Sequence, residues 1–174
     1  MKKTLLLYWA PGGNVELAAR AICEEIGTGK VEMCDVASFD ITRLDDFENF
    51  IIGSATVGAE DWRDTRDDNK WNEFFVKTSG FDLSAKKVAA FGLGNQILYP
   101  EHFVDSLGYM KEEVEKRNGK LYGLWPSSGY KFSDSEGATD GYFFGLALDH
   151  DTQPELTPVR VKSWIEMLSK KMAF

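Results

Sequence analysis

Histidine and cysteine are scarce in this sequence, which has two of each among its 174 residues. His102 and His150 stand far apart, and neither cysteine belongs to a set with metal-ligand spacing. Cys23 lies in a segment with helical periodicity, and Cys34 lies at the end of a strand-like run. We therefore expect two buried free thiols in a reducing compartment, with no disulfide and no metal site.

Long apolar runs and excess positive charge are also missing. No run approaches the roughly 20 apolar residues of a membrane-spanning helix, and the apolar stretch near the N-terminus is short for a signal peptide. The 20 Lys and Arg residues are outnumbered by 28 Asp and Glu, so the formal net charge is −8. This balance disfavours nucleic acids and anionic membranes and suits partners with basic patches. We predict a soluble, cytoplasmic monomer.

The apolar pattern that is present alternates between strand-like and helical segments. It predicts strands over 3–8, 30–36, 49–56, 86–94 and 120–125, and helices over 14–27, 69–80, 101–118 and 156–172. Such alternation indicates an α/β fold, a doubly wound five-stranded parallel sheet with helices on both faces. We expect one domain over residues 1–174, in which a polar, glycine-rich insertion at about 124–142 splits the last strand before a further strand-like run at 143–149.

Ligands of doubly wound sheets bind at the carboxyl ends of the strands, near the point where the strand order reverses. Three loops leave those ends, at 9–14, 54–62 and 92–102. The first reads Tyr-Trp-Ala-Pro-Gly-Gly-Asn-Val-Glu from residue 8 and has no Ser, Thr, Lys or Arg to hold a phosphate. Its glycines and the N–H groups of the following helix still predict a phosphate site made mainly of backbone.

Three segments resemble the long-chain flavodoxins, and the resemblance extends over essentially the whole chain. They read "FGLGNQILYPEHFVDSLG", "GLWPSSGYKF" and "DGYFFGLALDHDTQPELTPVRVKSWI". The resemblance implies a flavodoxin-like fold and a low-potential one-electron carrier with non-covalently bound FMN. It also implies protein partners with basic patches, namely a flavodoxin reductase and acceptor oxidoreductases.

The first two loops depart from the family pattern. Ala10, Gly12 and Val15 stand where family members carry hydroxyl residues, although the Gly13-Asn14 pair is kept. The second loop has Val57 where an aromatic residue usually covers the inner flavin face, and Trp9 or Trp62 are alternative sources of that ring. The resemblance makes Val57-Gly58 the candidate for a peptide that flips with the flavin redox state, and a plain glycine turn is the alternative.

The third loop keeps the stacking Tyr99 of the family but has Asn95 where Asp is common. Because reduced flavin is anionic, an amide at this position predicts higher reduction potentials than a carboxylate. The implied cofactor-binding set, which includes candidates at the ring edge, is Trp9, Ala10, Pro11, Gly12, Gly13, Asn14, Val15, Ser54, Ala55, Thr56, Val57, Gly58, Gly92, Leu93, Gly94, Asn95, Tyr99, His102, Phe103 and Asp151.

The sequence contains no recognisable set of catalytic residues, which favours a carrier over an enzyme. Two alternatives remain open. A flavodoxin-like interaction module that binds little or no flavin would explain the hydroxyl-poor first loop. An FMN-dependent NAD(P)H quinone reductase would share the fold, and steady NAD(P)H oxidation by the pure protein would distinguish it.

Overall fold

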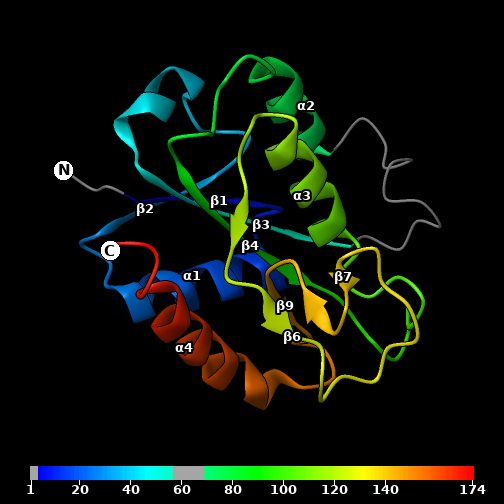
Figure 1. Cartoon of the computed structure of the whole chain (residues 1–174). Coiled ribbons are helices and arrows are strands. Elements are labelled where there is room, and N and C mark those ends of the chain that lie inside the picture. The colour runs from blue at the N-terminus through cyan, green and yellow to red at the C-terminus, as the bar shows by residue number, and fades with distance from the viewer. Residues whose placement is uncertain (1–3, 57–68) are drawn as a thin grey trace.

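The predicted parallel sheet is present in the computed structural model, which describes residues 4–56 and 69–174. Its strands run in the order β2-β1-β3-β4-β5, and β9 also pairs with β4 (Figure 1). The strands are β1 (Thr4–Trp9), β2 (Val31–Asp35), β3 (Asn49–Ala55), β4 (Lys87–Leu93), β5 (Leu121–Tyr122) and β9 (Leu146–Leu148). Both β5 and β9 pair with β4 in parallel, so the predicted split of the last strand is confirmed.

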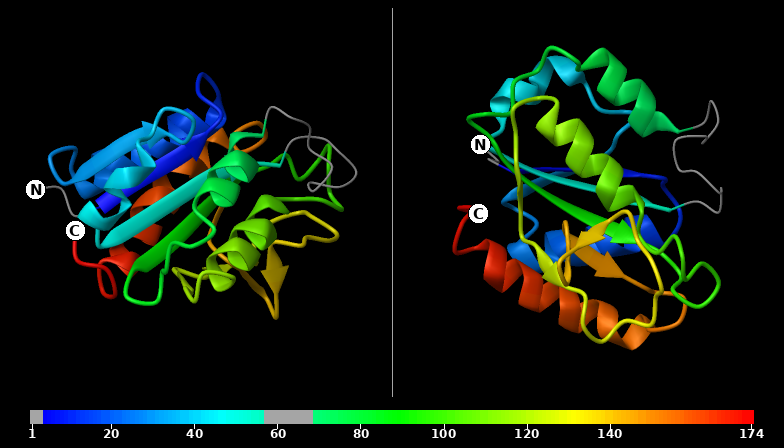
Figure 2. Two further views of the ribbon diagram at one scale, coloured as in Figure 1. Left: turned by 90° about the horizontal axis from the view of Figure 1, so that it is seen from above. Right: turned by 45° about the vertical axis from the view of Figure 1, so that its right-hand side comes forward.

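Helices cover both faces of the sheet, as Figure 2 shows from two directions. Helices α1 (Asn14–Ile26) and α4 (Thr157–Leu168) share one face, and α2 (Lys70–Lys77) and α3 (Ser106–Glu115) share the other. Alternate residues of each strand face opposite helical layers. In β1, Leu5 and Leu7 pack in the core beneath α2 and α3, whereas Leu6 packs in the core beneath α1 and α4. Burial on both sides explains why the strands read as continuous apolar runs.

Two helical segments differ from the expectation. The helix expected over 101–118 begins only at Ser106, because the preceding residues form turns in which Val104 has a φ of +51°. Between β2 and β3, where the sequence predicted no helix, the chain forms a short 3₁₀ helix, Ile41–Asp46. Local bonds favour this choice, since the Asp40 carboxylate accepts from the N–H and the hydroxyl of Thr42.

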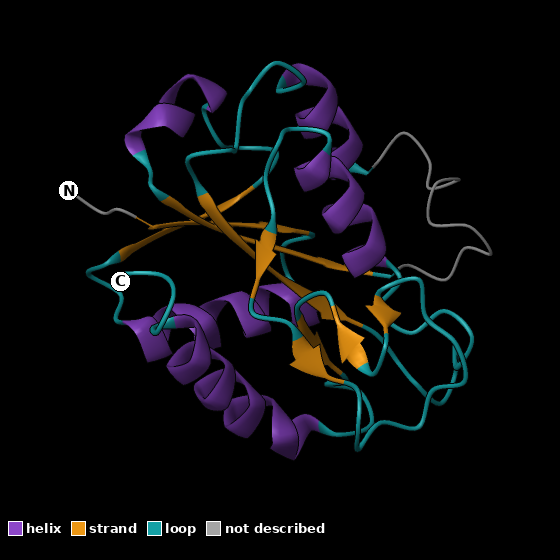
Figure 3. Cartoon of the chain, viewed as in Figure 1, coloured by secondary structure: helices purple, strands orange, loops and turns teal. Residues whose placement is uncertain are grey.

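The insertion contains strands that its polar sequence did not indicate. Strands β6 (Trp125–Pro126), β7 (Ala138–Thr139) and β8 (Tyr142–Phe143) form a small antiparallel sheet in the order β6-β8-β7 (Figure 3). The strand expected over 143–149 is interrupted at Gly145, where an added Cβ would lie 2.0 Å from the carbonyl oxygen of Ala90. That close approach of two backbones divides the run into β8 and β9.

Both cysteines are free thiols, as expected, but only Cys23 is buried. Cys34 is partly exposed because β2 is an edge strand of the sheet. Across the residues that the structure describes, none of the helices combines the length and the apolar character needed to cross a membrane.

Candidate functional site

Three parallel strands end at the same level of the sheet, and the three predicted loops follow them. Trp9 of β1 pairs with Ser54 of β3, and Ser54 pairs with Gly92 of β4. The strand order reverses at β1, because the chain proceeds to β2 on one side and later to β3 on the other. The loops therefore leave the sheet at its switch point, where ligands of doubly wound folds bind.

The first loop turns at Gly12, whose φ of +84° favours glycine. Helix α1 starts at Asn14, as predicted, and its N-cap Gly13 has no side chain to cap the first N–H groups. Residues 10–13 are exposed, and a Cβ added at either glycine would meet no atom within 4 Å. The side chain of Val15 points into the core, so only its N–H can face a ligand. The loop therefore presents open backbone donors.

Two carboxylates lie against this loop. Oε2 of Glu16 accepts a hydrogen bond from the Gly12 N–H at 2.7 Å, and Oδ1 of Asp151 accepts from Nδ2 of Asn14 at 2.9 Å. The Gly12 N–H and the Arg20 guanidinium lower the pKa of Glu16, so this carboxylate is ionised at neutral pH. Asn14 thus uses one of its two amide hydrogens on Asp151 and keeps the other.

The second loop begins with small and polar residues, of which Ser54 is buried and Ala55 and Thr56 are partly exposed. The hydroxyl of Ser54 is enclosed and has no hydrogen-bond partner among the described residues. After Ala55, the Thr56 hydroxyl accepts from the Ser106 N–H at 3.3 Å, which ties the loop to the start of α3. Val57, Gly58 and Trp62, on which the predictions of a flipping peptide and an inner aromatic wall depend, lie outside the described residues.

The third loop is a tight turn organised by Asn95. Its Oδ1 accepts from the N–H groups of Ile97 and Leu98, and its carbonyl oxygen accepts from the Tyr99 N–H at 2.9 Å. Nδ2 of Asn95 donates to Oδ2 of Asp151 at 3.3 Å. The Tyr99 side chain is 46% exposed, which leaves the ring available for stacking. Through Asp151 the structure brings the predicted residues Asn14 and Asn95 together.

A buried carboxylate anchors this turn. Asp149 is fully buried at the end of β9 and accepts four hydrogen bonds from two residues, Gln96 and Thr152. Gln96 donates its N–H and its side-chain amide at 3.1 and 3.0 Å, and its Oε1 accepts from the Lys131 N–H of the insertion. Through this bond the insertion supports the third loop.

Other predicted residues of the third loop lie beneath the surface. Gly92 and Leu93 are buried strand residues, and Phe103 is fully buried against Tyr130, Phe132 and Phe143. A Cβ at Gly94 would lie 2.9 Å from the Phe103 ring, so glycine permits this packing.

His102 is partly exposed beside the third loop. Its Nδ1 lies 2.9 Å from Oδ2 of Asp105, and this carboxylate raises the pKa of the imidazole. The raised pKa favours the charged form of the imidazole at neutral pH more than in an isolated histidine.

Glu16 and Gln96 contact the site although the sequence analysis did not select them. Glu16 is the third residue of α1, a position where a glutamate commonly reaches back to the N-terminal N–H groups, so its spacing was a usable signal. Gln96 carries no comparable signal, because its partner Asp149 is 53 residues away along the chain.

The fold defines a doubly wound α/β protein, and the loop geometry gives it a candidate ligand site built on backbone donors. The family model for flavodoxin matches residues 6–164. A flavodoxin of Picosynechococcus sp. is 38% identical over 169 residues, covering 97% of this chain and 96% of its own length. Flavodoxin 1 of Escherichia coli is 34% identical over 173 residues, covering 99% and 96%.

The structural comparison agrees with these matches. The crystal structure of the Fusobacterium nucleatum flavodoxin bound to flavin mononucleotide has a TM-score of 0.86 at 27% identity and covers 99% of both chains. The chain belongs to the flavodoxin family. The family resemblance and the fold predicted from the sequence are thereby confirmed.

Proposed function

We propose that this protein carries single electrons on a non-covalently bound FMN. The proposal rests on one observation: three loops leave a flavodoxin sheet side by side, at the point where the strand order reverses. Flavodoxins are electron-transfer proteins and not enzymes, and the Fusobacterium relative holds flavin mononucleotide. Both facts support this function over a reductase activity.

The residues of the site fit a flavin phosphate and ring. Open space above Gly12 and Gly13, with the uncapped start of α1, suits the close approach of an anionic group. The exposed Tyr99 ring, held by the Asn95 turn, suits stacking on a flat ring system. Phe103 is proposed to support the third loop by packing beneath it, because its side chain is fully buried.

FMN, when bound, supplies the chemistry, since it can take up and release single electrons. The chain would bind and orient FMN: the first loop and the start of α1 would hold the phosphate, and Tyr99 would stack on the ring. Asp151 holds the Asn14 and Asn95 side chains at fixed positions. Asn95 adds no negative charge beside the ring, which favours uptake of an electron relative to a carboxylate at the same place.

The partners of such a carrier are proteins with basic patches, such as a reductase and acceptor oxidoreductases. The formal charge of −8 supports this assignment, because long-range attraction to a basic surface speeds transient encounters and weakens with salt. We assign the carrier to the cytoplasm as a monomer, in keeping with its free thiols and acidic surface.

Titration of the apoprotein with FMN tests the function directly. We expect binding, seen by calorimetry and as quenching of flavin fluorescence, followed by reversible reduction of the complex. Riboflavin serves as the control ligand, because it has the ring but lacks the phosphate. A folded protein that ignores saturating FMN would make the interaction module the better assignment, and steady NAD(P)H oxidation with a quinone would favour the reductase.

Asn95→Asp is expected to lower the reduction potential of the FMN complex. The new carboxylate would add negative charge beside the ring and beside Asp151, and both effects oppose uptake of an electron. A spectroelectrochemical titration measures the change. Asn118→Asp is the control, because it adds the same charge after α3, far from the site loops. A potential that stays constant or rises in Asn95→Asp would contradict this role.

A further inference from the structure

The carboxylate of Glu16 uses a backbone donor of the first loop. It accepts the Gly12 N–H at 2.7 Å, one turn before its own position in α1. Its other oxygen accepts from Nη2 and Nε of Arg20 at 2.5 and 3.1 Å. The Glu16 side chain is 19% exposed, whereas the Arg20 side chain is 62% exposed and lies on the outer surface of the helix. The Glu16 carboxylate is therefore held at the first loop, and the exposed Arg20 guanidinium offsets its negative charge only in part.

Few donors remain for a phosphate. Residues 10–15 contain no hydroxyl group, and Pro11 has no N–H. Asn14 spends one amide hydrogen on Asp151. Within residues 12–16, the donors for which the structure gives no protein acceptor are the N–H groups at the start of α1 and the second amide hydrogen of Asn14.

The charges around the loop also act against a phosphate. Glu16 and Asp151 are negative and Arg20 is positive, so these three side chains together carry a net formal charge of −1. A phosphate dianion next to these three side chains is repelled by their net charge, and the partial positive charge of the helix start opposes that repulsion. A flavin ring without phosphate does not experience this repulsion.

We propose that Glu16 sets how strongly this protein distinguishes FMN from riboflavin, through the negative charge that it holds beside the donors of the first loop. This inference rests on the proposed flavin site. It makes Glu16 a specificity-determining residue whose effect depends on the ligand phosphate and not on the ring.

Glu16→Gln tests the inference by calorimetry of the apoprotein with FMN and with riboflavin. Glutamine keeps the side-chain length and an oxygen that can accept the Gly12 N–H, so the loop bond is preserved while the charge is removed. We expect FMN to bind about five- to tenfold more tightly than to the unmodified protein. Riboflavin affinity is expected to change by less than about twofold, because riboflavin carries no phosphate charge.

Two control variants lie on the same helix. Arg20→Gln leaves Glu16 without its cation and is expected to weaken FMN binding with little effect on riboflavin. Glu24→Gln removes an exposed carboxylate two turns beyond Glu16 and is expected to leave both affinities unchanged. An FMN-to-riboflavin affinity ratio that stays constant or falls in Glu16→Gln overturns the inference.

A second readout separates this inference from the proposed function. Inorganic phosphate should raise the melting temperature of Glu16→Gln apoprotein more than that of the unmodified apoprotein, since a ligand of the folded state stabilises it. Equal shifts of the melting temperature in the two proteins would contradict the proposed role of Glu16, even if FMN binds. If the unmodified protein binds neither flavin, the proposed function fails, and the phosphate experiment still decides the role of Glu16.

Discussion

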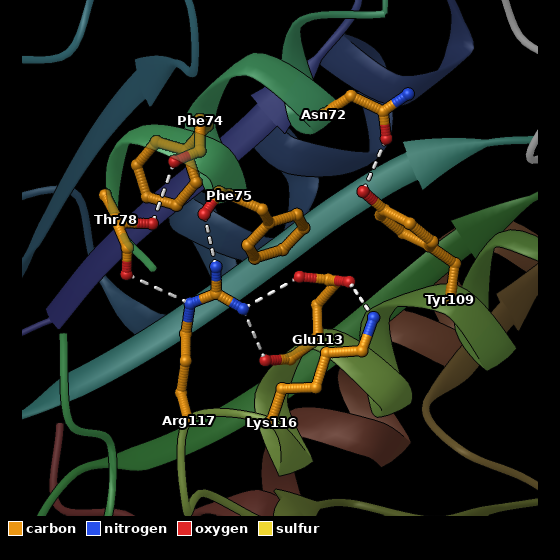
Figure 4. A network of polar contacts seen from close by, with 8 residues as sticks. All are labelled: Asn72, Phe74, Phe75, Thr78, Tyr109, Glu113, Lys116 and Arg117. Carbon is orange, nitrogen blue, oxygen red and sulfur yellow. Dashed lines mark hydrogen bonds and ion pairs between the residues drawn. The ribbon is translucent and has the colours of Figure 1, made fainter. Parts of the chain in front are cut away.

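Replacing Arg117 by methionine is expected to lower the free energy of unfolding by about 3–5 kcal/mol. The Arg117 side chain is only 5% exposed and is surrounded by acceptors from two helices (Figure 4). Nη1 donates to Oε2 and to the carbonyl oxygen of Glu113 at 2.8 and 2.7 Å. Nε donates to the carbonyl oxygen of Thr78 at 3.2 Å, and Nη2 donates to that of Phe75.

These bonds explain why the expected loss is large. The carbonyl groups of Phe75 and Thr78 lie at the end of α2, where a helix leaves its last carbonyl oxygens without helical partners, although the Thr78 oxygen also accepts from the Phe81 N–H at 3.0 Å. Arg117 satisfies them from beyond the end of α3 and also neutralises the largely buried Glu113 carboxylate. Methionine would fill much of the same volume but remove the guanidinium donor from the carbonyl groups of Phe75 and Glu113, and would leave the largely buried Glu113 carboxylate with only the exposed Lys116 as its cation. Such losses cost more than an exposed pair contributes.

Lys116→Gln is the matched control for this prediction. Lys116 contacts the same Glu113 carboxylate at 2.6 Å, but its side chain is 62% exposed. Its loss is therefore expected to cost less than about 1 kcal/mol. Urea unfolding followed by circular dichroism measures both variants. Equal losses in the two variants would show that burial of the Arg117–Glu113 pair is not the source of stability.

Asp149→Ala is expected to lower the stability by about 3–5 kcal/mol and to weaken FMN binding at least about tenfold. Asp149 is fully buried and accepts two hydrogen bonds each from Gln96 and Thr152. Alanine would leave these donors without an acceptor, and an unpartnered buried donor costs roughly 1–3 kcal/mol. The affinity falls because Gln96 lies within the turn that presents Tyr99.

The Asp149 prediction can be separated from a general loss of acidic charge. Asp45 is exposed, and its closest cation, Lys86, lies 3.8 Å away, so Asp45→Ala should change neither stability nor affinity appreciably. Asp149→Asn keeps one acceptor oxygen. Its stability in urea unfolding and its FMN affinity in calorimetry should lie between those of the alanine variant and the unmodified protein. If Asp149→Ala binds FMN normally while folded, the turn is held by other contacts.

Much of the architecture followed from local patterns in the sequence. The runs that became β1, β3 and β4 are predominantly apolar because both faces of these strands are buried. Helix α1 begins at the predicted Asn14, after the two glycines. The flavodoxin resemblance rested on the third loop and on the segments around the insertion, and family membership confirmed it. The cofactor-binding residues implied by that resemblance stay predictions.

The short and irregular elements did not follow from local patterns. The insertion strands have only two residues each, too few to show a period. The delayed start of α3 depends on turns at 99–105 and on bonds from the insertion, such as the Glu136 N–H to Oδ1 of Asp105 at 2.8 Å. Such bonds form only after distant segments meet, so the hydrophobic periodicity of the sequence does not predict them.

By itself, the sequence determined the layers of this protein and the sheet edge at which the candidate loops meet, because burial and backbone turns leave periodic and glycine signals. Only the tertiary structure decided which side chains meet at that edge. Asp151 contacts Asn14 across 137 residues, and Asp149 contacts Gln96 across 53. Hydrogen bonds of this kind act between atoms about 3 Å apart in space, and separation along the chain does not specify them.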